Sequence, residues 1–168
     1  FPSDASAAAT TSLTIKKLAV DGTTILSQKT VTYQELMAGK LGDGTPMPIL
    51  GDGAIEYYSQ GPVFIDEPVD ETMEIRRWNP EENTNITDKN NGALKGTNVK
   101  DLCNLVGGMS TGETVKIKAA DNFNKTFAYK NVYQYSDREG PMVICWYKNG
   151  LYPDSGYADG MRLHWFAD

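Results

Sequence analysis

Apolar and polar positions near the start of the chain alternate in a way that predicts a strand hairpin. Leu13, Ile15 and Leu18 lie among polar residues, which is typical of a half-buried strand. An Asp-Gly pair at 21–22 is a turn signal, and a second short apolar stretch follows at residues 23–26. We therefore expect two paired strands here.

A capping-box pattern predicts a short helix just after this hairpin. In such a box the hydroxyl of Thr32 and the carboxylate of Glu35 satisfy the exposed amides at the helix start. The helix is expected to run through Met37 and to stop at Gly39.

The clearest helix lies in the second half of the chain. Its apolar face repeats at the spacing i, i+3, i+4, i+7 in Val99, Leu102, Cys103 and Val106. Thr97 or Asn98 can cap its start, and the glycine pair at 107–108 can end it.

Further strands are predicted on both sides of a second turn signal. Residues 115–119 alternate apolar side chains with lysines, and the pair at 121–122 turns the chain into residues 126–129, which predicts a second hairpin. Residues 142–146 form a continuous apolar run, which is typical of a strand buried on both faces. The Asn-Gly pair at 149–150 then indicates a tight hairpin turn into residues 151–152.

The chain closes with another alternating segment. Met161, Leu163 and Trp165 alternate with Arg162 and His164, so we expect a final strand with the two basic side chains on one side.

Between residues 41 and 91 the pattern breaks up. Gly-Asp-Gly occurs at 42–44 and 51–53, and residues 66–71 are rich in acidic side chains. Connections of this length usually carry sites or are disordered, so we expect any function to involve this segment. Within it, residues 55–64 are expected to contain a strand followed by a turn. The carboxylates lack the regular ligand spacing of a calcium loop, which favours solvated turns.

Composition and charge indicate one globular domain and argue against some kinds of partner. A chain of 168 residues with 40% hydrophobic and 23% charged residues has the length and balance of one globular domain, expected to span residues 13–168 after a flexible tether at 1–12. The sequence is compatible with a leader or a lipid anchor ahead of the tether. The net charge of −6 without a basic cluster argues against nucleic acid or an anionic membrane surface as partner. No apolar stretch is long enough to insert in a membrane.

Cysteine and asparagine patterns bear on chemistry and location. Cys103 and Cys145 both lie in apolar patterns, which favours two separately buried thiols over a disulfide. With a single histidine in the chain, a structural zinc site is not expected. Sequons at Asn85 and Asn124 are compatible with an exported protein.

The order of these elements resembles a known family, the sulfite-oxidase-like molybdopterin oxidoreductases. Residues 93–108 are similar to that family's strand, glycine and short Leu-rich helix, and residues 115–133 to its following hairpin. Residues 142–166 are similar to its run of strand, Asn-Gly turn and Gly-x-x-x-Arg-Leu. The resemblance implies an α+β, strand-rich, mixed-sheet single domain with short helices. Residues 60–64 and 95–97 also resemble small archaeal cell-surface proteins of this fold.

The chain departs from the enzyme family at the metal ligand. In that family a cysteine thiolate ahead of the Leu-rich helix binds molybdenum, whereas no cysteine precedes Cys103 here. The family also continues into a segment that helps to hold the anionic pterin, and this sequence stops at Asp168. We therefore expect no cofactor, with molybdopterin as the alternative.

The candidate ligand-binding residues are aromatic, amide and basic, and no catalytic or metal-ligating residue is assigned. They are Tyr57, Tyr58, Gln60, Arg162 and His164. The fork of Arg162 suits a carboxylate or phosphate, although a structural ion pair explains it equally well. On an alternating strand His164 is more often half-exposed or hydrogen-bonded than catalytic. Trp78 and Trp146 are further candidates, for which a place in the core is the simpler interpretation.

These observations favour a non-catalytic binding or interaction domain that is secreted or anchored at the cell surface. Its partner would be a small molecule or a surface protein. Two alternatives remain: a molybdopterin-dependent oxidoreductase with an altered metal site, and a structural module of a surface layer. The sequence contains no nucleophile-elbow, phosphate-loop or metalloprotease motif.

Overall fold

The computed structural model describes residues 9–58, 90–135, 137, 139–155, 157 and 160–166. Its elements are β1 (Ser12–Leu18), β2 (Ile25–Thr32), α1 (Tyr33–Met37), β3 (Ile49–Leu50), β4 (Glu56–Tyr58), β5 (Asn90–Asn98), α3 (Val99–Asn104), β6 (Thr114–Lys118), β7 (Asn124–Ala128), α4 (Tyr129–Tyr133), β8 (Met142–Lys148) and β9 (Arg162–Trp165). The strand-rich α+β class is confirmed. Every strand pairing in the described residues is antiparallel, so the parallel pairing that a mixed sheet requires is not found there.

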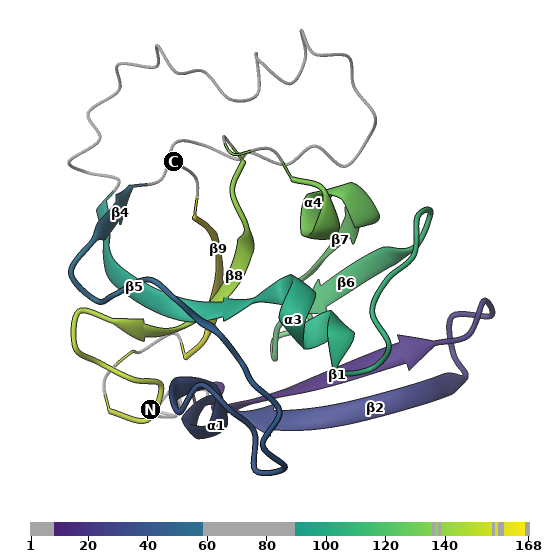
Figure 1. The fold of residues 1–168 in the computed structure, drawn as a ribbon, viewed down its shortest axis with the longest axis horizontal. Coiled ribbons are helices and arrows are strands. Elements are labelled where there is room, and N and C mark those ends of the chain that lie inside the picture. Colours follow the sequence, from purple (N-terminus) through teal and green to yellow (C-terminus); the bar gives the residue numbers. More distant parts are fainter. Residues whose placement is uncertain are drawn as a thin grey trace, which may run out of the picture.

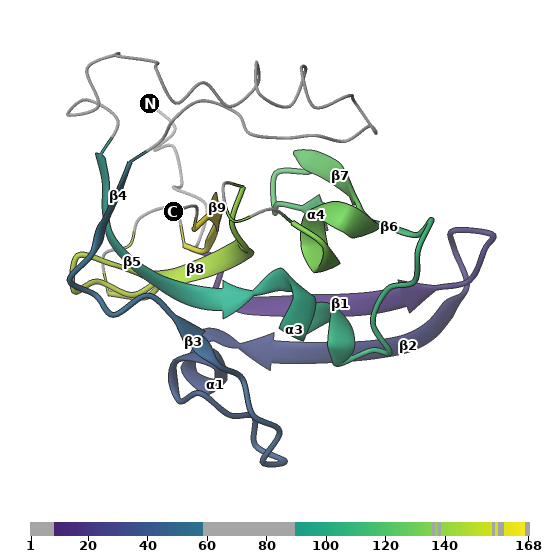
Figure 2. The same cartoon turned by 45° about the horizontal axis from the view of Figure 1, so that its top comes forward.

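The first predicted hairpin is confirmed as β1 and β2. Figures 1 and 2 show it as a long ribbon that passes alongside α3. Leu13 and Ile15 turn one side of β1 towards the core, as their alternation predicts. The turn is held by the carboxylate of Asp21, which accepts hydrogen bonds from the backbone amides of Thr23 and Thr24 at 2.9 and 2.8 Å.

The predicted capping box at the start of α1 is also confirmed. The Thr32 amide donates to the Glu35 carboxylate at 3.0 Å, and the Glu35 amide donates to the Thr32 hydroxyl at 3.3 Å. The helix ends at Met37, and Gly39 follows in the left-handed region with φ +72°. Leu36 is fully buried, so the cap positions a side chain that anchors the helix in the core.

A central antiparallel sheet has the order β3-β5-β8-β9, and β4 pairs with β5 as well. Figure 1 shows β5 running through the middle of the molecule and leading directly into α3. Gly96 of β5 is required for this pairing, because a Cβ there would lie 2.4 Å from the backbone oxygen of Ile144 on β8.

The main core lies on one face of this sheet. Its buried members are Val31, Tyr33, Leu36, Leu41, Met47, Val99, Leu102, Cys103, Phe127, Val132, Met142, Ile144 and Trp146. The predicted helix face is confirmed for Val99, Leu102 and Cys103, whereas Val106 is buried beyond the helix, which ends at Asn104. The start of α3 is capped by Asn98, whose side chain accepts from the Lys100 amide at 2.9 Å. The indole N–H of Trp146 donates to the Thr97 hydroxyl at 3.0 Å, which satisfies both buried groups.

The second hairpin, β6 and β7, is confirmed with one correction. The strand predicted to reach Tyr129 ends at Ala128, and the next five residues form α4. The side chain of Asn131 explains the change, because it accepts from the Ala128 amide at 3.1 Å and donates to Glu139 at 3.0 Å. This local cap starts a helix in place of further strand.

The remaining predicted strands are present. All of residues 142–146 are buried, as expected for a strand covered on both faces. Asn149 and Gly150 adopt φ +49° and +83°, and paired hydrogen bonds between Lys148 and Leu151 close the turn. No helix in the described part of the chain is long and apolar enough to cross a membrane.

Candidate functional site

The candidate residues Arg162 and His164 lie on the face of the central sheet opposite the main core. β9 pairs with β8 so that Arg162 is opposite Cys145 and His164 is opposite Val143. Directly paired residues of antiparallel strands project to the same face. The alternating Leu163 and Trp165 pack against the main core, which confirms the predicted alternation of β9.

The side of the central sheet opposite the main core is the second face. Its buried floor consists of Leu94, Val143 and Cys145, and the half-buried side chains of Leu50, Tyr57 and Phe166 pack against that floor. The floor residues come from β5 and β8, two strands that are far apart in the sequence. The second face is thus a small buried apolar cluster bordered by aromatic and basic side chains.

Tyr57 is brought to the second face by β4. Its ring stacks on that of Phe166, with 4.1 Å between ring centroids and 16° between ring planes. Phe166 follows β9 directly, and its amide donates to the Pro141 oxygen at 3.0 Å, which keeps it in line with the sheet. Tyr57, Arg162 and His164, named from the sequence, therefore share one face, and Phe166 is a member that sequence reasoning missed.

The other named candidates are not brought together with them. Tyr58 is the last residue of β4, and only its backbone is described. Gln60, Trp78 and the sequon at Asn85 lie outside the described residues. Trp146 belongs to the main core, where its side chain is fully buried, so the core interpretation is confirmed.

Burial and two neighbouring cations lower the pKa of His164. Burial, followed by the charges of Arg162 and Lys148, lowers the pKa of His164 to about 4. Lys148 pairs with Leu94 across the sheet and so projects to the second face as well. At neutral pH the ring is uncharged and offers one donor and one acceptor. A histidine with this pKa is a weak general base at neutral pH.

The two cysteines do not fit the role of a molybdenum ligand. Both are free and buried, which confirms the prediction of two separate thiols. Burial raises the pKa of the Cys103 thiol to about 11 and raises that of Cys145 further still. A metal ligand must be a thiolate that solvent and metal can reach. Among the described residues, no group of three or more His, Cys, Asp or Glu side chains is arranged to hold a metal ion.

The carboxylates of the two Gly-Asp-Gly motifs form turns. Asp43 accepts from the amide and the hydroxyl of Thr45 at 3.0 and 2.7 Å. Asp52 accepts from the amides of Ala54 and Ile55 at 2.8 and 3.0 Å. In each turn one carboxylate oxygen, Oδ1, accepts both bonds, as expected for a turn. The acidic stretch at 66–71 lies outside the described residues.

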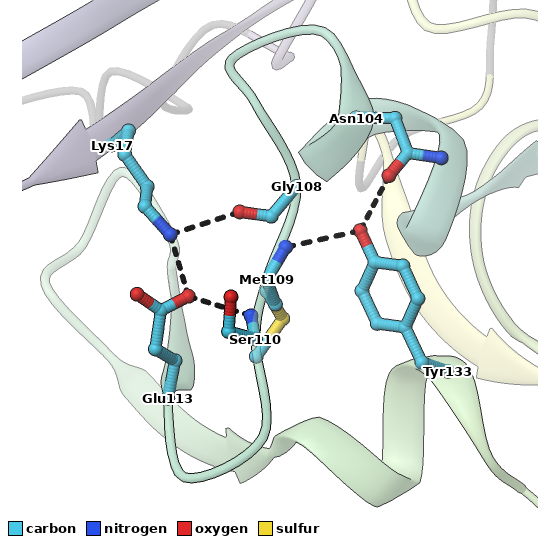
Figure 3. Close-up of polar contacts among 7 residues, drawn as sticks. All are labelled: Lys17, Asn104, Gly108, Met109, Ser110, Glu113 and Tyr133. Carbon is cyan, nitrogen blue, oxygen red and sulfur yellow. Dashed lines mark hydrogen bonds and ion pairs between the residues drawn. The ribbon is translucent and has the colours of Figure 1, made fainter.

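A second polar cluster joins β1 to the loop after α3 (Figure 3). The ammonium of Lys17 contacts the Glu113 carboxylate and donates to the Gly108 oxygen at 3.0 Å, while the Ser110 amide donates to Glu113 at 2.8 Å. Nearby, the Tyr133 hydroxyl donates to Asn104 at 2.6 Å. These groups satisfy one another, which is typical of a structural clasp. Its only signal in the sequence is a lysine at an inward position of the alternating β1.

Comparisons with known proteins give no match. No protein-family model, curated protein or solved structure is similar to the chain. The functional interpretation therefore depends on the geometry of the second face.

Proposed function

We propose that this chain is a binding domain of a secreted or cell-surface protein and that its ligand contacts the second face. The observation that carries the proposal is the convergence of Tyr57 with Arg162 and His164 on one surface, from strands about a hundred residues apart in the sequence. Stacked aromatic rings offer a large contact area, and a guanidinium and a neutral imidazole add directional hydrogen bonds. Binding sites commonly combine such groups over an apolar floor.

The non-catalytic part of the proposal is supported by the state of the reactive groups among the described residues. The His164 ring is a weak base at neutral pH, and both thiols are buried in their protonated form. The sulfite-oxidase-like fold stays part of the proposal, supported by β5, which contains Gly96 and is followed directly by α3, the succession on which the resemblance rests. It implies a relative of the molybdopterin enzymes that binds without their cofactor.

Binding at the second face is tested by two-dimensional amide NMR with small aromatic fragments, namely benzoate, phenyl phosphate and benzamide. We expect the chemical-shift changes to gather on β4, β8 and β9 and to disappear in Tyr57→Ala. The matched control is Phe123→Ala, which removes another aromatic ring, 65% exposed, at the tip of the β6–β7 hairpin. Shift changes that map elsewhere, or that survive Tyr57→Ala and vanish in Phe123→Ala, contradict the proposal.

Elemental analysis of the protein from its native source tests the non-catalytic part. We expect substoichiometric molybdenum and tungsten. Molybdenum close to one atom per chain would contradict the proposal. It would indicate an oxidoreductase whose metal ligands are residues other than Cys103 and Cys145.

A further inference from the structure

The β6–β7 hairpin has one side packed on the protein and one side exposed to solvent. Val115, Ile117 and Phe127 contribute to the main core. Alternate residues of a strand project to opposite sides, so the residues between these three point away from the core. In the part of the chain that the structure describes, no third strand pairs with this hairpin. The exposed members of this outer side are Thr114, Lys116, Lys118, Asn124 and Thr126.

A complete Asn-x-Thr sequon lies at the start of β7. Asn124 and Thr126 are two residues apart in the strand, so both project from the outer side, about 6.6 Å apart. Lys125, at the middle position, is exposed as well. The turn that precedes the sequon contains Asn122, which adopts the left-handed region with φ 72°. A glycan is bulky and polar and therefore needs a surface position, which this junction of turn and strand provides.

We infer that Asn124 is a site of N-glycosylation. This modification goes beyond ligand binding at the second face and depends only on the exported location that is part of the proposed function. The co-substrate is a glycosyl phosphate donor. The side-chain nitrogen Nδ2 of Asn124 forms a bond to the anomeric carbon of the sugar. The bond between that carbon and the phosphate oxygen breaks, the phosphate leaves with the electron pair, and a base takes the displaced amide proton.

The hydrogen bonding of Asn124 is compatible with an attached sugar. Its Nδ2 donates to the backbone oxygen of Asn122 at 3.0 Å on the surface of the turn. A free side-chain amide has two hydrogens, and a glycosylated amide keeps one of them. One N–H is enough for this contact. The turn is also held by Asp121, whose carboxylate accepts from the Phe123 amide at 2.9 Å. Glycosylation therefore leaves the turn intact.

The surroundings of Asn124 leave room for the sugar. The residue opposite it on β6 is Lys118, whose exposed and flexible side chain can move aside. Asn131, which follows the same hairpin, shows the opposite situation. It is 1% exposed, and its side chain bonds to the Ala128 amide and to Glu139. A sugar on Asn131 would disrupt the core, whereas one on Asn124 extends into solvent.

Mass spectrometry of the full chain from its native source tests the inference. Cleavage after lysine gives a peptide that begins at residue 119 and contains both Asn122 and Asn124. Fragmentation by electron transfer leaves a glycan on the residue that carries it. We expect the mass of a sugar on Asn124 and none on Asn122, which is exposed in the same turn but lacks a threonine two residues later.

Two outcomes overturn the inference. One is recovery of this peptide in its unmodified form alone. The other is a sugar on Asn85 without any on Asn124, which would support the exported location but assign the modification to the other sequon. Neither outcome bears on ligand binding, because the fragment experiment on β4, β8 and β9 is read separately. The failure of one proposal is thus distinguishable from the failure of the other.

Variants expressed in the native host test the role of the sequon. Thr126→Ala removes the hydroxyl that defines the sequon, so we expect complete loss of the modification. Thr126→Ser keeps a hydroxyl and should retain it. Lys125→Ala, at the middle position, is the matched control and should leave the occupancy unchanged. Each variant changes an exposed side chain, and circular dichroism checks its fold. Equal occupancy in Thr126→Ala and Thr126→Ser would overturn attachment through this sequon.

Discussion

The two faces of the central sheet are made from alternate residues of the same strands, yet they are covered in different ways. Ile144 of β8 and Leu163 of β9 pack in the main core, to which α1, α3 and both hairpins also contribute buried side chains. Val143 and Cys145 project to the opposite face, where they form a buried floor together with Leu94. Half-buried rings and two cations border this floor. The main-core face thus provides most of the buried apolar area, which stabilises the fold, and the second face is a smaller cluster whose three floor residues are themselves fully buried.

The largest expected effect comes from a substitution in the main core. Trp146→Ala should lower the free energy of unfolding by about 3–5 kcal/mol, because it removes a fully buried ring and leaves the Thr97 hydroxyl without its indole partner. Urea denaturation followed by circular dichroism measures the change. Leu151→Ala, at a side chain that is 43% exposed, is the control and should cost about 0.5 kcal/mol or less. Equal losses would contradict the assignment of Trp146 to the core.

The next effect overfills the second face. Gly96→Ala should cost about 3 kcal/mol, because the added Cβ meets the Ile144 oxygen at 2.4 Å and the Cys145 Cα at 2.8 Å. Its control is Gly22→Ala in the β1–β2 turn, where φ is +71° and nothing lies within 4 Å, so only the backbone penalty of about 1 kcal/mol applies. Thermal denaturation of both variants measures the difference. A cost for Gly96→Ala no greater than for Gly22→Ala would mean that β5 and β8 are less closely paired.

The third effect is a pH dependence that comes from His164 on the second face. Because the pKa of His164 is lowered to about 4 in the folded chain, the unfolded chain binds a proton first as the pH falls below about 6.5. The contribution of neutral His164 to the free energy of unfolding is therefore fully present above pH 6.5 and is lost progressively down to pH 4. About 2 kcal/mol is lost between pH 7 and pH 5. Urea denaturation of the protein and of His164→Gln at both pH values measures it. A slope that persists in His164→Gln would assign the effect to another group.

The smallest effect concerns the Lys17–Glu113 clasp beside the main core. Lys17 and the Ser110 amide hold the pKa of Glu113 below its usual range, so the contribution of the clasp is present above pH 4.5 and is lost as the pH falls through the folded pKa. We expect Lys17→Met and Glu113→Gln to be non-additive in a double-mutant cycle, with a coupling that salt reduces. Strict additivity at low salt would show that the contact contributes nothing to stability.

Local patterns predicted most of the elements. The capping box of Thr32 and Glu35, the apolar face of α3 and the Asn149–Gly150 turn depend on residues close in sequence, and all three are present. α4 was missed, because five residues are too few to display a helical repeat. β5 was anticipated through the family resemblance rather than its pattern, since Asn98 and Lys95 disguise a strand that is largely buried.

The sequence by itself determined which side chains alternate on β9, and therefore that Arg162 and His164 project together. Only the tertiary structure decided that Tyr57, Phe166 and Lys148 join them, because strand register depends on hydrogen bonds between segments that are distant along the chain. It also decided that the pKa of His164 is lowered to about 4, so that the ring stays neutral well below pH 6.5. That property comes from burial and from two neighbouring cations, one of which is supplied by another strand.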